Sequence, residues 1–331
     1  MAAVALCLMV AAPAAFAQDP LEKIAQKTKI DRLDQARIQT EVSERAKKLA
    51  DAGTDANQRL QARERLLSTY RLKTASKDFK DFYAECCAKG LELLATSEVF
   101  ETGFDAVMVL SELGSVKTAE TLAEALKSVH AATRLRAARG LQALQKQLVA
   151  DPKAAKIPLR ALGEAGAAET QGPVLRVIYE AIDFGGGQQA DSLADDCAKA
   201  LNVIFAGRLE RLKAGARNET LDERGIELAG RCYAAASEAQ QKQLIDNVAK
   251  LLRHQVERYF ASDTAEGYLP TLASLAKKTE DSIRQMIKAS KAREPAKSVA
   301  DTLKKGGKED AAKAALDELQ GVLKGEPWNL P

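Results

Sequence analysis

The stretch Leu135-Arg136-Ala137-Ala138-Arg139-Gly140-Leu141-Gln142-Ala143-Leu144 recurs at an offset of 40 residues as Leu175-Arg176-Val177-Ile178-Tyr179-Glu180-Ala181-Ile182. Arginine aligns with arginine, and apolar residues align with apolar residues. A third copy at 104–113 keeps the apolar spacing but has Asp105 where the other two have arginine. Each of the two better copies follows another short helical segment, at 118–127 and 154–165. Repetition at such periods is typical of stacked repeat architectures, so the predicted unit is a pair of antiparallel helices.

This pattern resembles a HEAT repeat, in which a first helix ends Leu-x-x-Ala-Leu and a second begins Leu/Val-Arg-x-x-Ala-x-x-Leu. The best match is Leu122-Ala123-Glu124-Ala125-Leu126 followed by 135–144, although the usual turn aspartate is absent at 130–133. Over about residues 100–183, the resemblance implies an all-α fold in which helical hairpins stack into an α-solenoid. It also implies that Arg136 and Arg176 bridge adjacent repeats by pairing with loop carbonyls or carboxylates.

The rest of the chain has the composition of an all-α protein. Of its 331 residues, 46% are hydrophobic and only 5% aromatic, and β-branched runs are scarce, which favours helices over strands. We predict a single amphipathic helix within 18–55, a HEAT-like solenoid over 56–261, and a basic helical region over 262–331. The basic region either caps the solenoid or forms a separate bundle, with Trp328 packed on the last helix or offered to a partner.

Individual helix ends carry recognisable signals. Gly114 should close one helix, and Asp151 followed by Pro152 should cap the start of another. Capping-box spacings predict helix starts near Leu221 and Glu238, and the second of these helices should extend to about residue 260.

Residues 1–17 resemble a secretory signal peptide. Val4 to Ala15 is an uncharged apolar run that ends in Ala15-Phe16-Ala17, a typical cleavage pattern. We therefore expect export to a periplasmic or extracellular compartment, with no transmembrane segment in the mature chain. No lysine or arginine precedes the run, which suggests an upstream start codon or, as the alternative, failed export. Cys7 lies too close to the start for lipidation.

Few residues suggest catalysis or metal binding. The chain has two histidines: His130 is placed in a turn, and His254 opposite an apolar stripe. The cluster Asp191, Asp195 and Asp196 suits a helix N-terminus better than a calcium site. The triple glycine at 185–187 lacks the Lys-Ser/Thr ending of a phosphate loop and is expected to be a hinge or inter-repeat loop. We therefore predict no catalytic residue, metal or cofactor.

The cysteines match no zinc pattern. Cys86 and Cys87 fall on or beside an apolar stripe, so buried thiols are the expected state. Two alternatives stay open in an oxidising compartment: a Cys197–Cys232 disulfide, or a redox-sensitive Cys86/Cys87 pair.

Charge is unevenly distributed, although the formal net charge is only +3. Residues 90–130 hold seven acidic and two basic side chains, whereas 277–308 hold ten basic and four acidic ones. We predict partner-binding roles for exposed cations on the best repeat and in the C-terminal region: Arg134, Arg139, Lys288, Lys291, Lys304 and Lys305. A solvated helix face and structural ion pairs are the alternative explanations. Nucleic acid is not an expected partner, because export and the lack of interleaved aromatic residues disfavour it.

Three functions remain open on sequence alone. The favoured hypothesis is a non-enzymatic exported scaffold that binds protein partners on a solenoid surface. The second is an adaptor that holds anionic polymers or a membrane surface through the basic C-terminal region. The third is an enzyme, or an enzyme accessory subunit, with a carboxylate site that the sequence does not reveal.

Overall fold

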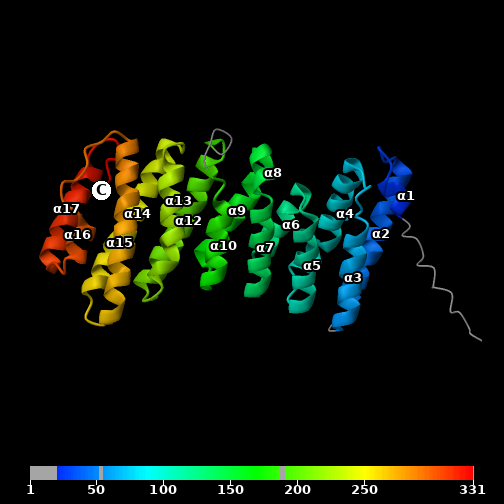
Figure 1. The fold of residues 1–331 in the computed structure, drawn as a ribbon, viewed down its shortest axis with the longest axis horizontal. Coiled ribbons are helices and arrows are strands. Elements are labelled where there is room, and N and C mark those ends of the chain that lie inside the picture. The colour runs from blue at the N-terminus through cyan, green and yellow to red at the C-terminus, as the bar shows by residue number, and fades with distance from the viewer. Residues whose placement is uncertain (1–20, 52–54, 186–190, 331) are drawn as a thin grey trace, which may run out of the picture.

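The computed structural model describes residues 21–51, 55–185 and 191–330. The regular elements in these ranges are all helices, so the all-α prediction is confirmed for this part of the chain. They form an elongated row with α1 and α2 at one end and α17 at the other (Figure 1). The predicted signal segment 1–17 lies outside the described residues, as do Gly186 and Gly187 of the expected hinge.

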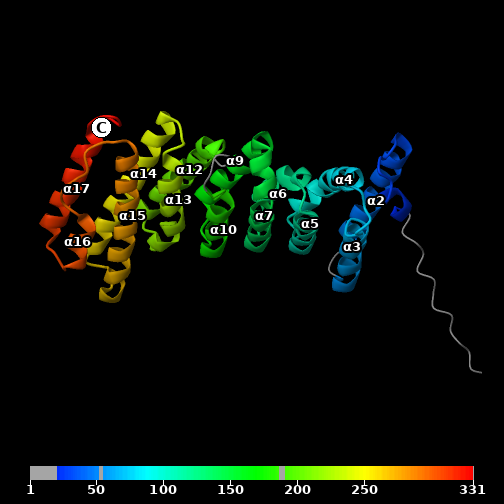
Figure 2. The same cartoon turned by 45° about the horizontal axis from the view of Figure 1, so that its top comes forward.

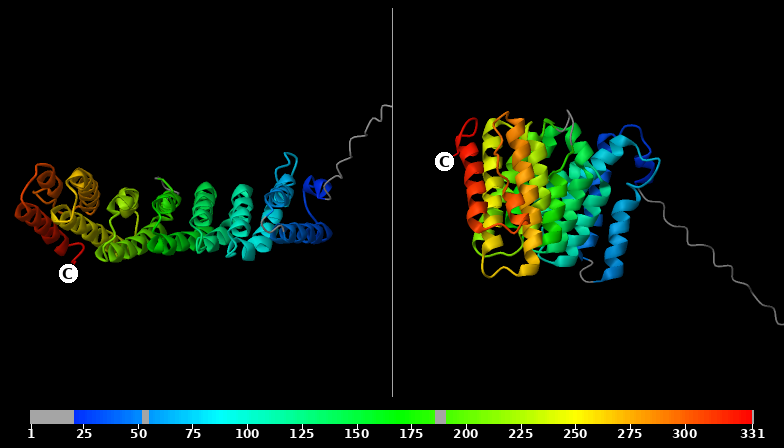
Figure 3. Two further views of the ribbon diagram at one scale, coloured as in Figure 1. Left: turned by 90° about the horizontal axis from the view of Figure 1, so that it is seen from below. Right: turned by 60° about the vertical axis from the view of Figure 1, so that its left-hand side comes forward.

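The long helices lie in two layers, and successive ones alternate between the layers (Figure 3, left). The first layer contains α2 (Arg32–Asp51), α4 (Lys77–Ala95), α6 (Ala119–Ala125), α9 (Pro152–Ala168), α12 (Ala194–Lys213) and α14 (Glu238–Phe260). The second contains α3 (Ala56–Ser68), α5 (Phe100–Leu113), α7 (Ala131–Ala143), α10 (Gly172–Ile182), α13 (Glu223–Tyr233) and α15 (Leu269–Ala289). Within each layer, every helix packs on the next one in the row.

The three sequence copies correspond to α5, α7 and α10, which lie side by side in the second layer. Most of their apolar residues, among them Leu110, Leu141 and Ile178, are buried. One continuous hydrophobic core extends from Leu21 to Trp328. A single helix pair cannot cover both of its faces, so the core is continuous because each pair is buried by its neighbours.

The N-terminal segment differs from the single helix predicted. It consists of a short α1 (Glu22–Ala25), a break, and α2. The break has a local cause: the Asp31 carboxylate accepts from the Asp34 N–H at 2.9 Å, and the Asp34 carboxylate accepts from the Asp31 N–H at 3.1 Å. This reciprocal pair is a capping box with aspartate in the usual glutamate position, and it starts a new helix.

Most predicted helix ends are confirmed. α5 ends before Gly114, which adopts the left-handed conformation at φ 56°. α9 starts at Pro152, and the Asp151 carboxylate accepts from the Ala154 N–H. α14 spans the predicted residues, but α13 starts at Glu223, two residues late, because a 3-10 turn (Glu219–Asp222) comes first. The described residues also contain the shorter elements η1 (Val116–Thr118), α8 (Gln145–Ala150) and η3 (Glu266–Tyr268).

Small residues let α9 and α12 approach closely in the first layer. A Cβ on Gly207 would lie 2.7 Å from the Ala167 carbonyl oxygen, and one on Gly163 would lie 3.0 Å from the Ala200 Cα. Any side chain at either glycine would therefore press on backbone rather than on a movable side chain. The two helices pack backbone against backbone at this point.

The C-terminal helices continue the row. α15 packs on α13 and α14, α16 (Val299–Lys304) packs on α15, and α17 (Glu309–Lys324) packs on α16 and α14 (Figure 2). Trp328 is buried, and its indole N–H donates to the Tyr233 hydroxyl at 2.6 Å. Of the two predicted roles, the structure therefore shows Trp328 packed on the chain itself. No helix of the described residues is long and apolar enough to cross a bilayer.

Candidate binding groove between helices α7, α10 and α13

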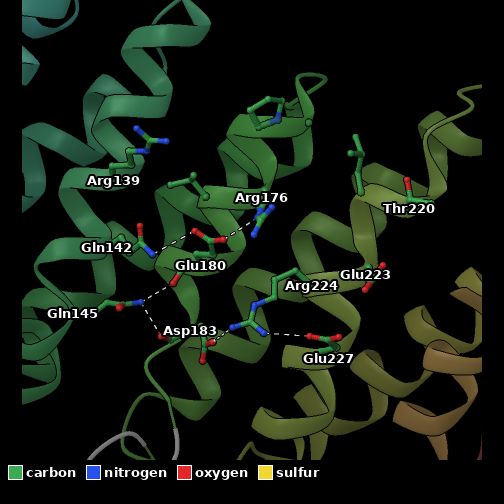
Figure 4. Close-up of a pocket in the computed structure, with 14 residues that line it drawn as sticks. Arg139, Gln142, Gln145, Arg176, Glu180, Asp183, Thr220, Glu223, Arg224 and Glu227 are labelled. Atoms are coloured by element: carbon green, nitrogen blue, oxygen red, sulfur yellow. Dashed lines mark hydrogen bonds and ion pairs between the residues drawn. The ribbon is translucent and has the colours of Figure 1, made fainter.

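A groove with a volume of about 1220 Å³ opens across three helices of the second layer (Figure 4). We call it the α10 groove, because α10 lies between its two walls. Its lining residues are Arg139, Gln142, Gln145, Gly172, Pro173, Arg176, Val177, Glu180, Asp183, Thr220, Leu221, Glu223, Arg224 and Glu227. Pockets for small ligands usually enclose roughly 300–1,000 Å³, so this groove is large for such a ligand.

The wall between α7 and α10 is held by amide hydrogen bonds. The Gln145 side-chain amide donates to the carbonyl oxygens of Glu180 at 2.7 Å and Asp183 at 2.8 Å. These carbonyls belong to the last turn of α10 and the residue that follows it, where helices leave acceptors without intrahelical partners. One side chain of the α7–α8 junction thereby fixes the C-terminal end of α10.

The wall between α10 and α13 is held by charge. The Asp183 carboxylate accepts from Arg224 at 2.7 Å and from Arg231 at 2.9 Å, and both arginines belong to α13. Arg224 also pairs with Glu227 at 3.2 Å, one turn along its own helix. Figure 4 shows Arg224 between Asp183 and Glu227. Asp183 therefore connects the end of α10 to the polar face of α13.

A buried ion pair lies behind this wall. Arg208 donates to both carboxylate oxygens of Asp222 at 2.8 and 3.0 Å, and the exposed fractions of the two side chains are 0% and 1%. The Tyr179 hydroxyl donates to the same carboxylate at 3.0 Å, and Arg208 also donates to the Asn218 carbonyl. Burial raises the pKa of Asp222, and the bidentate contact with Arg208 opposes that rise. This network links α10, α12 and the turn before α13.

The groove brings together Arg139 and Arg176, which come from two different sequence copies. Arg176 is 76% exposed and pairs with Glu180 of its own helix at 3.0 Å. Arg139 is exposed and makes no ion pair or hydrogen bond with the described residues. Among the arginines that line the groove, Arg139 is thus the one without an ion-pair partner in the described residues.

Arg134 makes the closest arginine contact between α7 and the helix pair that follows it. Its guanidinium donates to both oxygens of Glu169, at 2.7 and 3.0 Å, and to the carbonyls of Ser128 and Val129. Arg136 lies 3.9 Å from Glu112 of α5, whereas Arg176 pairs only within α10. Arg134 is therefore engaged in the chain itself, and its partner-binding role stays a prediction.

The four predicted C-terminal lysines are exposed and have no ion-pair partner among the described residues, but they form two groups. Lys288 and Lys291 lie at the C-terminal end of α15. Lys304 and Lys305 end α16 beside the C-terminus of α14, where the Tyr259 hydroxyl donates to the Leu303 carbonyl. α14 and α15 are antiparallel neighbours, so the two groups lie at opposite ends of α15. A helix of its 21 residues is about 30 Å long.

The other candidates take structural positions. His130 precedes α7, and its Nε2 lies 2.8 Å from the Glu98 carbonyl. His254, expected to project away from the core, is partly buried with its Nε2 3.5 Å from Glu219. Asp195 accepts from the N–H and hydroxyl of Ser237, which lowers its pKa and ties α12 to the start of α14. The described residues contain no group of three or more His, Cys, Asp or Glu side chains that could hold a metal ion.

Sequence reasoning missed the α13 side of the groove. Glu223, Arg224 and Glu227 lie on the polar face of α13, whose start the capping-box spacing predicts to within two residues, but they are not among the predicted site residues. Their alternating charges were the available signal. What the sequence did not show is that this face lies opposite α10.

Comparisons with known proteins do not assign this chain to a family. No protein-family model matches the sequence, and no curated protein matches it. A solved structure described as "Computational Design of Self-Assembling Cyclic Protein Homooligomers" is similar over 92% of this chain and 96% of that chain, with 16% sequence identity and a TM-score of 0.24.

Proposed function

We propose that this protein is a HEAT-type α-solenoid that acts as an exported, non-enzymatic scaffold and binds a segment of a partner protein in the α10 groove. The observation that carries the proposal is the groove itself, with the unpaired Arg139 on one wall and carboxylates on the other. The adjacent positions of α5, α7 and α10, which are copies in sequence, support the solenoid assignment.

The chemistry of the groove favours a polypeptide ligand. Its walls carry three arginines and four carboxylates, so a polyanion such as nucleic acid meets more repulsive than attractive groups. Val177, Leu221 and Pro173 add apolar surface between the charges. A partner segment with both apolar and charged side chains, including an acidic one for Arg139, matches this lining.

The groove charges are arranged for recognition rather than for proton transfer. Arg176, Arg224 and Asp183 are each held in ion pairs at 2.7–3.2 Å. An ion pair that already satisfies a carboxylate leaves it a poor general base, because catalytic bases need access to a substrate proton. This arrangement supports a binding function over the accessory-enzyme alternative.

Site-specific photocrosslinking in the native host tests the proposal. A photoreactive residue replaces Gln142 in the groove, and a matched one replaces Lys199, which is exposed on α12 in the other layer. We expect one partner to be captured from position 142 but not from position 199. The charge reversal Arg139→Glu should reduce that capture roughly tenfold. Capture that is equal at both positions, or that Arg139→Glu leaves unchanged, would contradict the proposal.

Export is tested separately. Residues 1–17 are fused to a reporter enzyme that is active only outside the cytoplasm. We expect activity from this fusion and its loss when Leu6 and Leu8 of the apolar run are replaced by aspartate, because the charges disrupt the segment that directs export. An inactive fusion would contradict export, but it would leave the proposed binding of a partner segment in the α10 groove unaffected.

A further inference from the structure

Helices α9 and α12 meet at a corner that holds two arginines. Arg208 and Arg211 lie three residues apart on α12, so their side chains leave the same face of the helix, with Cβ atoms roughly 5–6 Å apart. Arg208 is fully buried and Arg211 is half-buried. Nη1 of Arg211 donates to the carbonyl of Ala167 in the last turn of α9. The corner therefore lies in the first layer, beside the buried Arg208–Asp222 ion pair.

The guanidinium of Arg208 shows how an arginine is satisfied at this corner. Its Nε and Nη2 atoms form one edge of the planar group, and they donate to the Asp222 carboxylate at 2.8 and 3.0 Å. Arginine binds carboxylates and phosphates through such a fork of two parallel hydrogen bonds. Nη2 also donates to the carbonyl and side-chain oxygens of Asn218, both at 2.9 Å. The fork of Arg208 is thus fully occupied by the chain itself.

The same edge of Arg211 has no partner. Its Nε and Nη2 atoms are buried, and neither makes a hydrogen bond with the described residues. Nη1 of Arg208 is buried and unpartnered in the same way. Buried polar groups nearly always have a hydrogen-bond partner, so each unpartnered one calls for an explanation. These nitrogens, on one face of α12, are placed to receive an acceptor from outside the chain.

The charges at the corner favour an anion over water. Asp222 is already paired with Arg208, and Glu169, which follows α9, is already bound by the Nε and Nη2 atoms of Arg134. The second cation of the corner, Arg211, therefore has no carboxylate of its own. Burial and the neighbouring Arg208 lower the pKa of Arg211, as they do for a cation whose charge is not compensated. Water satisfies N–H groups, but only an anion also offsets the charge.

We propose that the fork of Arg211, with Arg208 beside it, binds a small oxyanion such as inorganic phosphate or a free carboxylate. Nε and Nη2 of Arg211 donate to two oxygens of the anion, in the arrangement that Arg208 makes with Asp222. Nη1 keeps its hydrogen bond to Ala167, so one guanidinium connects the anion to the end of α9. The anion thereby strengthens the contact between α9 and α12. The site is separate from the α10 groove, whose lining includes neither arginine.

Isothermal titration of the purified full chain with sodium phosphate, at constant ionic strength, tests the site. We expect saturable binding of one phosphate per chain. Arg211→Lys keeps the charge but removes the fork, and Arg211→Gln removes both, so the affinity should fall roughly tenfold or more in each variant. The matched control is Arg160→Gln, which removes an exposed arginine of α9 and should bind phosphate as the wild type does.

A parallel titration with sodium acetate distinguishes the two kinds of oxyanion. Binding of either anion that depends on Arg211 supports the proposal, and the tighter one shows whether the fork prefers a tetrahedral or a planar ligand. Circular dichroism establishes that each variant is folded before it is titrated. If Arg211→Gln does not fold, Arg211→Lys and the wild type decide the question.

Two results would overturn the proposal. In one, neither phosphate nor acetate binds to the wild-type chain. In the other, the affinity and stoichiometry are the same in the wild type and in a folded Arg211 variant, which would show that the anion binds elsewhere.

Discussion

Arg134 and Glu169 join three helices through one bidentate contact. The guanidinium of Arg134, at the start of α7, meets both oxygens of Glu169, which follows α9. The same carboxylate accepts from the N–H groups of Thr170 and Gln171 just before α10, at 2.9 and 2.8 Å. The exposed fraction is 19% for the Arg134 side chain and 1% for that of Glu169. One buried carboxylate thus connects the turns of two successive helix pairs.

Removal of the guanidinium should destabilise the fold strongly. Arg134→Ala leaves the buried Glu169 charge with only backbone donors, and we expect the free energy of unfolding to fall by about 2–3 kcal/mol. Urea denaturation followed by circular dichroism measures this. The matched control is Arg160→Ala, which removes an exposed arginine 3.9 Å from Glu164 and should cost less than about 0.5 kcal/mol. Equal losses in the two variants would show that the Glu169 contact has no special role.

The same contact should make stability depend on pH. Burial alone would raise the pKa of Glu169, but the hydrogen bonds from Arg134 and the Gln171 N–H outweigh it and hold the pKa below its ordinary value of 4.5. A lowered folded pKa means that ionised Glu169 stabilises the fold above pH 4.5, and this contribution is lost as the pH falls through the folded value. We expect the difference in unfolding free energy between wild type and Glu169→Gln to shrink from pH 7 to pH 4. A difference that stays constant over this range would be inconsistent with an ionised, stabilising Glu169.

The contact between α9 and α12 should tolerate no added methyl group. Gly207→Ala would place a carbon 2.7 Å from a backbone oxygen, and we expect a loss of about 1–3 kcal/mol. Gly321 in α17 faces open space, so Gly321→Ala should stabilise the chain by about 0.5–1 kcal/mol through its higher helix propensity. The melting temperatures of the two variants should therefore move in opposite directions. A neutral Gly207→Ala would show that the two backbones have room to separate.

The separation of the C-terminal lysines predicts weak membrane binding. The two groups lie about one α15 length apart, so they do not combine into a single basic patch. We expect no cosedimentation with phosphatidylglycerol vesicles at physiological ionic strength, where exposed charges are screened beyond about 8 Å. Binding that persists there, and that is lost in both Lys288→Glu/Lys291→Glu and Lys304→Glu/Lys305→Glu, would favour the membrane-adaptor function instead.

Local signals in the sequence predicted local structure well. The apolar spacing of the copies located α5, α7 and α10, and Asp151 with Pro152 located the start of α9. The break before α2 was missed although its signal is local. Asp31 and Asp34 form a capping box, but the motif usually has glutamate in the position of Asp34. The buried state of Cys86 and Cys87, expected from their position on or beside the apolar stripe, is confirmed.

Contacts between helix pairs were much harder to predict. Arg134, Arg136 and Arg139 lie on one helix, and the sequence does not show which of them faces a turn, a neighbouring helix or solvent. The partner of Arg134 is 35 residues away and that of Arg224 is 41 away, so both depend on how successive pairs stack. The groove could not be inferred for the same reason, because its walls come from three pairs.

The two layers differ in what holds neighbouring helices together, and this gives the row a preferred direction of bending. Around its centre, the first layer packs backbone on backbone at Gly163 and Gly207, whereas the second is joined by charges at Asp183. Separating α9 from α12 would open voids in a dry contact. Separating α10 from α13 would break the Asp183 ion pairs, which water partly replaces, and a smaller contact between Tyr179 and Gly225. Under load or high salt, the row should therefore bend by separating α10 from α13 in the second layer, while the helices of the first layer stay packed.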